Sequence, residues 1–301
     1  NPNIIYPATI SIEQCSSEQT ASYKTTILRH SGLAPESHLI DLTGGFGVDS
    51  YYFSKQFKIV TYLEPNLDLF NIVQQNFKNL DATNINCRNT TTEDFLKTNS
   101  QKFDIAYIDP SRRNENEKVF MLADCIPNIV DLKEEILKIA DFILIKTSPI
   151  LDIKQSIKEL KNVKDIWVVS LNNECKEVLY LVGKEHISNP KINTVNIPLL
   201  GEPAPIPRRV RGGLTHEFSF NYNEEENCTP EFSEPLNYLY EPNASILKAG
   251  AFKTVALKYR LKKIAQNSHL YTSEKLIEDF PGRSFKVKTV IPYQPKVFKK
   301  L

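Results

Sequence analysis

The sequence lacks the features that mark metal-binding, disulfide-rich and membrane-spanning proteins. Its five cysteines lie far apart and form no CxxC pair, which argues against a disulfide framework and a zinc site. Its five histidines are equally scattered, so their spacing supports neither a metal site nor a catalytic triad. Apolar runs are short, such as FILI at 142–145, far below a membrane span. With no secretory signal pattern visible, we expect a cytoplasmic protein with no metal and no membrane partner.

Its composition is that of a globular protein, but its charge is unevenly distributed. Hydrophobic residues make up 41% and charged residues 24% of the 301 positions, which excludes disordered and fibrous classes. Residues 1–185 carry 20 basic and 25 acidic residues, whereas residues 186–301 carry 17 and 11. The basic C-terminal part predicts an anionic partner or a solvated basic surface. The chain begins with Asn, and we expect it to be part of a longer protein.

Between His38 and about Gly183, short apolar segments alternate with helical periodicity. The predicted strands are 38–42, 58–63, 84–88, 103–108, 141–145, 165–170 and 177–182. The predicted helices between them are 66–80, 93–97, 129–140 and 152–161, and another helix over 11–32 precedes the first strand. This order is typical of a doubly wound, mostly parallel α/β sheet of Rossmann-like type. The last two strands follow each other without a helix, which predicts an antiparallel hairpin at one edge.

Beyond residue 185 the pattern changes, and we place a domain boundary there. Residues 201–213 are rich in proline and arginine, and residues 221–235 are a polar tract. Residues 241–265 predict one long helix with an apolar stripe and several lysines. The predicted units are a helical lead-in, an α/β domain, a small basic α+β domain and a C-terminal remainder, at 1–37, 38–185, 186–284 and 285–301.

The most informative stretch is DLTGGFGVD at 41–49, at the turn from the first strand into the first helix. Glycines there permit a sharp turn and the close approach of a ligand. An acidic residue, Glu64, ends the second strand, where a carboxylate can accept the hydroxyl hydrogens of a ribose. A dinucleotide fingerprint needs a third glycine where Ser50 stands. Asp41 would repel a pyrophosphate but attract a methionine ammonium, so S-adenosylmethionine is favoured over a dinucleotide. The alternative is a glycine-rich turn that only closes a loop.

A second polar group, DPSRR at 109–113, follows the fourth strand. Ligands of open α/β sheets lie outside the carboxyl ends of the strands, so Asp109 is a candidate catalytic residue that orients a nucleophile or accepts its proton. Arg112 and Arg113 are candidates for binding a phosphate or carboxylate, although an Asp-Pro turn with solvated arginines is the alternative. Lys146 ends the fifth strand as either a further anion contact or an ordinary lysine.

Together these residues resemble class I S-adenosylmethionine-dependent methyltransferases over about residues 10–183. Asp41 to Gly47 is similar to their first motif, Glu64 to their second-strand acidic residue, and Asp109-Pro110 to their fourth motif. The resemblance implies that S-adenosylmethionine is the cofactor, with an adenine contact after the third strand. The implied cofactor-binding residues are Asp41, Thr43, Gly44, Gly45, Phe46, Gly47, Asp49, Glu64, Thr92, Asp94, Asp109 and Pro110. Amino-methylating members continue with Pro and an aromatic residue where Ser111 and Arg112 stand, so the acceptor atom stays open.

A closer resemblance is carried by SIEQCSSEQTASYK, DPSRR, EPNASILKAGAF and NSHLYTSEKLIEDFPGRSFKV. These segments are similar to a bacterial methyltransferase family with a ferredoxin-like middle domain and a THUMP-like C-terminal domain. THUMP domains accompany RNA-modifying enzymes, so the resemblance implies a transfer or ribosomal RNA substrate. It also implies that residues 186–284 are ferredoxin-like and that residues 285–301 begin a truncated THUMP-like domain.

The expected function is therefore methyl transfer from S-adenosylmethionine to RNA. Arg208, Arg209 and Arg211, in a proline-stiffened loop, are candidates for following a phosphate backbone. The alternatives are a small-molecule or protein methyltransferase whose basic region is only a surface, and a non-catalytic RNA-binding module on the same fold.

Overall fold

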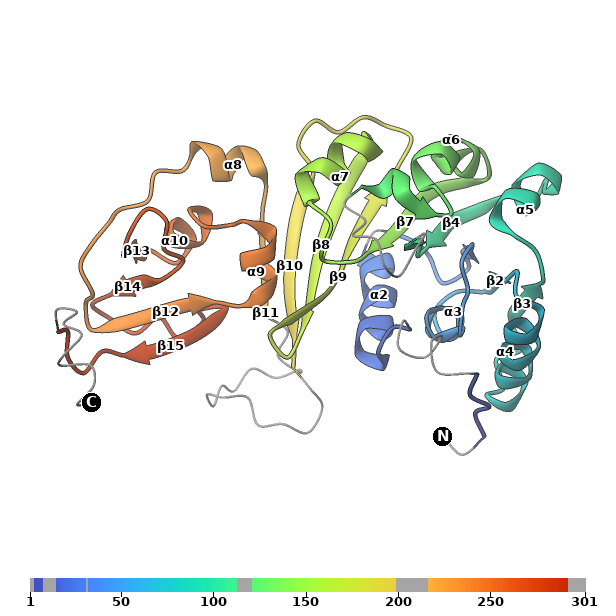
Figure 1. Ribbon diagram of the computed structural model, residues 1–301, viewed down its shortest axis with the longest axis horizontal. Coiled ribbons are helices and arrows are strands. Elements are labelled where there is room, and N and C mark those ends of the chain that lie inside the picture. The colour runs from blue at the N-terminus through green and yellow to red at the C-terminus, as the bar shows by residue number, and fades with distance from the viewer. Residues whose placement is uncertain (1–2, 8–14, 31, 113–120, 199–215, 292–301) are drawn as a thin grey trace.

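A computed structural model describes residues 3–7, 15–30, 32–112, 121–198 and 216–291. Its main feature is a nine-stranded sheet with the order β11-β10-β8-β9-β7-β4-β1-β2-β3 (Figure 1). The strands are β1 (His38–Asp41), β2 (Ile59–Leu63), β3 (Ile85–Arg88), β4 (Phe103–Ile108), β7 (Ala140–Thr147), β8 (Val163–Leu171), β9 (Glu174–Val182), β10 (Lys191–Ile197) and β11 (His216–Phe220).

The five consecutive strands β3, β2, β1, β4 and β7 are parallel to one another. Leu39 and Ile40 are both fully buried although they point to opposite faces, as are Ile105 and Ala106 in the neighbouring strand. Near-continuous apolar segments of this kind are what a sheet covered on both faces requires. The parallel alignment brings the carboxyl ends of β1, β2, β4 and β7 to one edge of the sheet. The predicted doubly wound α/β fold is confirmed.

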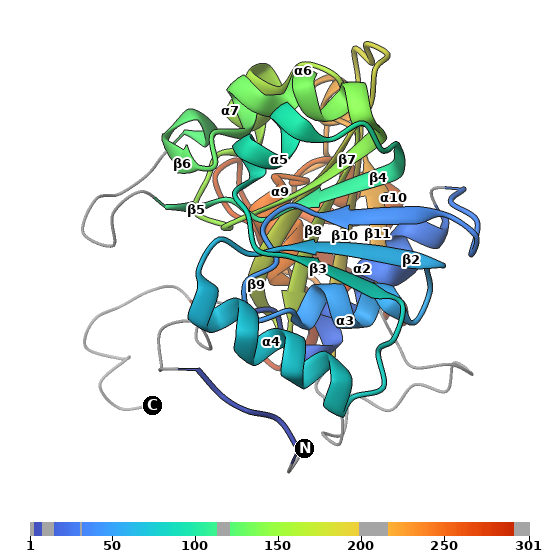
Figure 2. The ribbon, with the colours of Figure 1, turned by 90° about the vertical axis from the view of Figure 1, so that its right-hand side faces the viewer.

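Helices cover both faces of this sheet (Figure 2). One layer holds α2 (Glu18–His30), α3 (Val48–Ser54) and α4 (Leu67–Asn79), and the other holds α5 (Thr92–Thr98), α6 (Ile129–Ile139) and α7 (Ile153–Leu160). The side chains of Asn66, Thr91, Asn128 and Asp152 cap the helices that follow them. Because such caps satisfy otherwise unpaired N–H groups, the helices begin close to the predicted positions.

The predicted antiparallel hairpin forms between β8 and β9, but it lies inside the sheet and not at its edge. The sheet then continues beyond it, since β10 pairs with β8 and β11 pairs with β10. The predicted boundary near residue 185 is therefore placed too early. Ile192 and Val195 are fully buried, and Phe218 is only 5% exposed, so these strands extend the core of the same sheet. The Pro- and Arg-rich segment between them hid this continuity in the sequence.

A smaller sheet with the order β13-β14-β12-β15 follows. Its strands are β12 (Tyr238–Pro242), β13 (Lys262–Lys263), β14 (Tyr271–Ser273) and β15 (Gly282–Lys286), and its helical neighbours are α8 (Tyr222–Asn227), α9 (Ala244–Ala249) and α10 (Thr254–Lys258). A short hairpin of β5 (Ser111–Arg112) and β6 (Cys125–Ile126), with the 3-10 helix η1 (Leu122–Asp124), follows β4. Within the described residues, no helix is long and apolar enough to cross a membrane.

The prediction of a single helix over 241–265 is wrong. Helix α9 ends at Gly250, whose φ of 79° is the left-handed conformation of a helix C-cap. The chain then starts α10, where the Glu225 carboxylate accepts hydrogen bonds from the backbone N–H groups of Phe252, Lys253 and Thr254. Ile246 and Ala249 of α9 and Val255 and Ala256 of α10 are buried nonetheless, and α9 packs on the strands of the large sheet (Figure 1).

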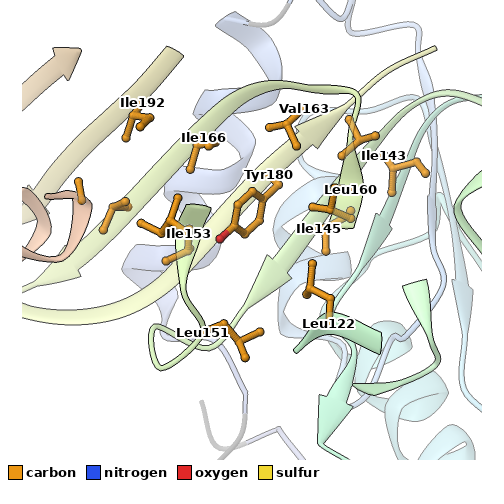
Figure 3. Packing of buried hydrophobic residues seen from close by; sticks show 14 of the residues in the cluster. Leu122, Ile143, Ile145, Leu151, Ile153, Leu160, Val163, Ile166, Tyr180 and Ile192 are labelled. Atoms are coloured by element: carbon orange, nitrogen blue, oxygen red, sulfur yellow. The ribbon is translucent and has the colours of Figure 1, made fainter. Parts of the chain in front are cut away.

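The main core lies between the large sheet and the layer of α5, α6 and α7. Figure 3 shows part of this cluster, in which residues of β7 and β8 meet side chains of α7 and η1. Tyr180 of β9 lies at its centre, with its ring among aliphatic side chains (Figure 3). Close packing on this face fixes the loops that follow β4 and β7, which form one side of the candidate site.

Candidate active site

The glycine loop between β1 and α3 fits closely against β2. A Cβ on Gly44 would lie 2.1 Å from the ring of Tyr62, and one on Gly47 would lie 2.7 Å from Phe77 and Val73. Gly47 also has a φ of 78°, which glycine adopts without strain. The Tyr62 hydroxyl donates to the carbonyl of Gly45 at 2.6 Å. The glycines are thus required by the packing of the loop, and the loop is fixed in place.

Glu64 lies beside this loop at the end of β2. Its carboxylate accepts hydrogen bonds from Gly45 N at 3.1 Å and Asn66 N at 2.8 Å. Burial raises the pKa of Glu64, against the opposing effect of these two bonds. The side-chain amide of Asn89, after β3, donates to the Glu64 carbonyl at 2.8 Å. These contacts hold an acceptor carboxylate at the edge where β1, β2 and β3 end.

Asp41 is buried under the loop, only 1% exposed. One carboxylate oxygen accepts from Thr43 N at 3.1 Å, and the other accepts from the Ser50 hydroxyl at 2.6 Å. Burial raises its pKa to about 7, and the nearby carboxylates of Asp49 and Asp109 add to this rise. Asp41 therefore holds the loop through Thr43 and connects it to the first turn of α3 through Ser50.

Asp109 and Lys146 form an ion pair between the ends of β4 and β7. The Asp109 Oδ2 to Lys146 Nζ distance is 2.5 Å, with side-chain exposures of 31% and 12%. The hydroxyl of Thr43 accepts from Asp109 N at 2.6 Å, which joins this pair to the glycine loop. Burial alone would lower the pKa of Lys146, but the carboxylates of Asp109, Asp49 and Glu177 outweigh it and raise that pKa. From the sequence, Lys146 was either a further contact to a bound anion or an ordinary lysine, and neither interpretation includes its ion pair with Asp109.

A buried charge network lies behind the pair. Lys24 of α2 is fully buried, with its Nζ 3.1 Å from Asp49 Oδ1 and 2.9 Å from Glu177 Oε2. The hydroxyls of Ser16 and Tyr107 donate to Asp49 Oδ2 at 2.8 and 2.7 Å. Burial would raise the pKa of Asp49, but Lys24 and Lys146 reverse this and lower it. The network connects the start of the chain to the sheet edge.

Sequence reasoning missed Lys24 and Glu177. A signal for Lys24 was present, because it falls on the helical stripe formed by Ala21, Thr25 and Leu28, which are all buried. A lysine on the buried face of a helix needs a charged partner. Glu177 gave no such signal, because only the pairing of β9 with β7 brings it beside Lys146.

Other predicted residues have structural roles or lie outside the described residues. The Thr92 hydroxyl donates to the Leu42 carbonyl at 2.7 Å, and Asp94 is exposed and paired with Lys97. The ring of Phe46 lies 6.0 Å from that of Tyr6, and Pro110 is half-buried. Arg112 forms part of β5. The residues outside the described ranges are Arg113, Arg208, Arg209 and Arg211.

Comparisons with known proteins agree with this architecture. A family model described as conserved hypothetical protein 95 matches residues 25–168, and a model of a ferredoxin-like domain matches residues 238–281. A crystal structure of a candidate methyltransferase from Porphyromonas gingivalis W83 is 31% identical, with a TM-score of 0.83, and covers 99% of this chain and 71% of that one. The chain belongs to the same family. The ferredoxin-like match covers β12, β13 and β14 of the four-stranded sheet and ends just before β15.

More distant structures share only part of the chain. A candidate methyltransferase of Escherichia coli, yhhF, is 14% identical with a TM-score of 0.44, and covers 60% of this chain and 92% of that one. A candidate RNA methyltransferase of Pyrococcus horikoshii is also 14% identical, with a TM-score of 0.43, and covers 60% and 91%. No curated protein matches the chain. Within the described residues, no group of three or more His, Cys, Asp and Glu side chains could hold a metal ion.

Proposed function

We propose that the chain is an S-adenosylmethionine-dependent methyltransferase that acts on RNA. The observation that carries this proposal is the position of the Glu64 carboxylate, held at the carboxyl edge by the N–H of Gly45 in the glycine loop. A carboxylate at the end of the second strand suits the two hydroxyls of a ribose. Gly44 and Gly47 let the loop pack closely on Tyr62, Phe77 and Val73, whereas at Gly45 the space next to the backbone stays open.

The same geometry supports a role for Asp109 in catalysis. When bound, S-adenosylmethionine supplies an electrophilic methyl group on a sulfonium sulfur. Asp109 is half-exposed at the adjacent strand end, and its Oδ2 is held by Lys146. Its other oxygen, Oδ1, orients the acceptor and takes the proton that the acceptor loses as it is methylated. Lys146 holds the carboxylate and Thr43 holds the backbone N–H of Asp109, which together fix the residue for a productive approach.

RNA is the proposed substrate because of the charge of the C-terminal part and the family resemblance to THUMP-containing enzymes. From residue 246 onward the chain has 13 basic and 3 acidic residues. We propose that these residues, together with Arg208, Arg209 and Arg211, neutralise backbone phosphates in the cytoplasm. Each phosphate contact to a single strand would steepen the salt dependence of binding by about 0.7 log units per log unit of salt.

Transfer of a tritiated methyl group from S-adenosylmethionine to bulk transfer and ribosomal RNA tests this function. Wild-type protein should label RNA, and Asp109→Ala should lower the rate about 100-fold or more, as expected for loss of a proton acceptor. Label in protein or small molecules instead would favour the alternative substrate classes. RNA binding without transfer, unchanged in Asp109→Ala, would favour a non-catalytic binding module.

A further inference from the structure

Three exposed apolar side chains lie in the segments that follow β4 and β7, the strands that lead to Asp109 and Lys146. Met121, Ile126 and Ile150 are 48%, 51% and 57% exposed. Ile126 lies in β6 directly opposite Ser111, two residues beyond Asp109. Ile150 lies in the loop that begins just after Lys146 and Thr147 at the end of β7. We call these three residues the apolar rim.

Buried leucines and hydrogen bonds hold the loops that carry the rim. Leu122 and Leu151, each next to a rim residue, are 1% and 5% exposed in the same core cluster (Figure 3). Leu122 N donates to the Glu159 carboxylate of α7 at 2.9 Å, and Lys248 of α9 donates to the Leu151 carbonyl at 2.9 Å. These contacts fix the loops that carry the rim, while its three side chains stay about half exposed among the residues that the structure describes.

We propose that the apolar rim contacts the face of the acceptor nucleobase of an RNA substrate. This inference rests on the proposed function and adds the chemical form of its acceptor. A base has apolar faces and a polar edge, and the site offers matching surfaces: the rim beside the polar pair of Asp109 and Lys146. Enzymes that modify bases hold an extruded base between apolar side chains while polar groups bind its edge. A phosphate or a sugar is polar and would gain no binding energy from contact with Met121, Ile126 and Ile150.

The double variant Ile126→Ser/Ile150→Ser tests this contact. The matched control is Ile5→Ser/Phe232→Ser, whose residues are 45% and 51% exposed and lie outside the basic stretch that begins at residue 246. The probe is a short single-stranded oligoribonucleotide with one 2-aminopurine, whose fluorescence reports the surroundings of the base. We expect the rim variant to bind at least about tenfold more weakly, since covering two isoleucines contributes on the order of 1.4 kcal/mol or more, and the control to bind within about twofold of wild type.

An abasic version of the oligonucleotide should bind the wild type and the rim variant equally. Equal affinity of wild type and rim variant for the 2-aminopurine probe, or an equal loss in the control, would overturn the proposal. So would a wild type that binds no RNA. Thermal shifts with S-adenosylhomocysteine, measured on the same samples, distinguish failure of the rim proposal from failure of the proposed function. If the rim proposal fails but the shift is unchanged, the proposed cofactor site is still supported. If the wild type shows no shift, the proposed methyltransferase function is contradicted.

Discussion

At the scale of single residues, the site is an array of ionisable groups at one sheet edge. Glu177, Lys146, Asp109 and Asp41 come from the neighbouring strands β9, β7, β4 and β1, and Lys24 reaches the array from α2. Several of these charges are buried, so each depends on its partner. A buried ion pair contributes little by itself, but removing one member leaves an uncompensated charge, which is strongly destabilising.

Lys24→Met should therefore lower the free energy of unfolding by about 3–5 kcal/mol, because Asp49 and Glu177 would lose their shared cation. Lys58→Met is the matched control, since Lys58 pairs with Glu36 at the surface, where the two side chains are 57% and 78% exposed. Its effect should be much smaller, because solvent screens an exposed ion pair. Urea unfolding measures both. Equal effects of the two substitutions would show that the buried network does not stabilise the fold.

Asp41 should make stability depend on pH. Its native pKa is raised to about 7, from an ordinary value of 3.8, so between these values the native state holds a proton that the unfolded chain has released. The stability from this group is present at low pH and lost as the pH rises toward 7, by up to about 1.4 kcal/mol per pH unit.

Asp41→Asn removes this titration. The wild type's stability relative to the variant should fall by about 2 kcal/mol between about pH 5 and pH 7, measured by urea unfolding at each pH. Parallel pH profiles for the two proteins would contradict the raised pKa.

At the scale of elements, the glycine loop joins the fold to the proposed function. The loop packs on Tyr62 of β2, begins α3 at Gly47 and binds Glu64 through the N–H of Gly45. An added Cβ therefore has no room at Gly44 or Gly47. The β5–β6 hairpin and the loop after β7 form the opposite side of the site.

Gly44→Ala should destabilise the protein by about 1–3 kcal/mol, the usual effect of overpacking, because its Cβ would overlap the ring of Tyr62. It should also abolish the thermal shift with S-adenosylhomocysteine, since the ring or the loop must move. At Gly183, in contrast, a Cβ would lie 3.4 Å from Phe142, so Gly183→Ala should retain the shift. Thermal melts of the two variants with and without ligand make the comparison, and a full shift in Gly44→Ala would refute the close fit.

At the scale of the whole molecule, local sequence patterns predicted the parallel sheet, its order of helices and strands, and the edge at which Asp41, Glu64, Asp109 and Lys146 meet. These features follow from apolar periodicity and from the alignment of parallel strands. The position of β10 and β11 could not be predicted, because a strand's sheet is decided by pairing across a long intervening segment. The break at Gly250 was readable as a helix C-cap, but the apolar stripe that continues beyond it concealed the break.

The buried charge network also could not be predicted from local sequence patterns. Asp49 belongs to the glycine motif and Tyr107 lies two residues before Asp109, yet the ion-pair partner Lys24 is 25 residues from Asp49, and Glu177 belongs to the hairpin. Only tertiary structure brings the four together. The roles proposed for Arg208, Arg209 and Arg211 are supported by their charge alone. The proposed cofactor site is supported by contacts between residues that the structure describes.

The central claim is that the glycine loop and Glu64 form the site for S-adenosylmethionine. A thermal melt of the wild type with S-adenosylhomocysteine, with NAD as the matched control, tests it most directly. At a hundredfold excess over Kd the ligand should add about 2.7 kcal/mol and raise Tm by several degrees. NAD should not change Tm, and Glu64→Gln should reduce the shift. A shift with NAD alone, or one that Glu64→Gln leaves intact, would contradict the account.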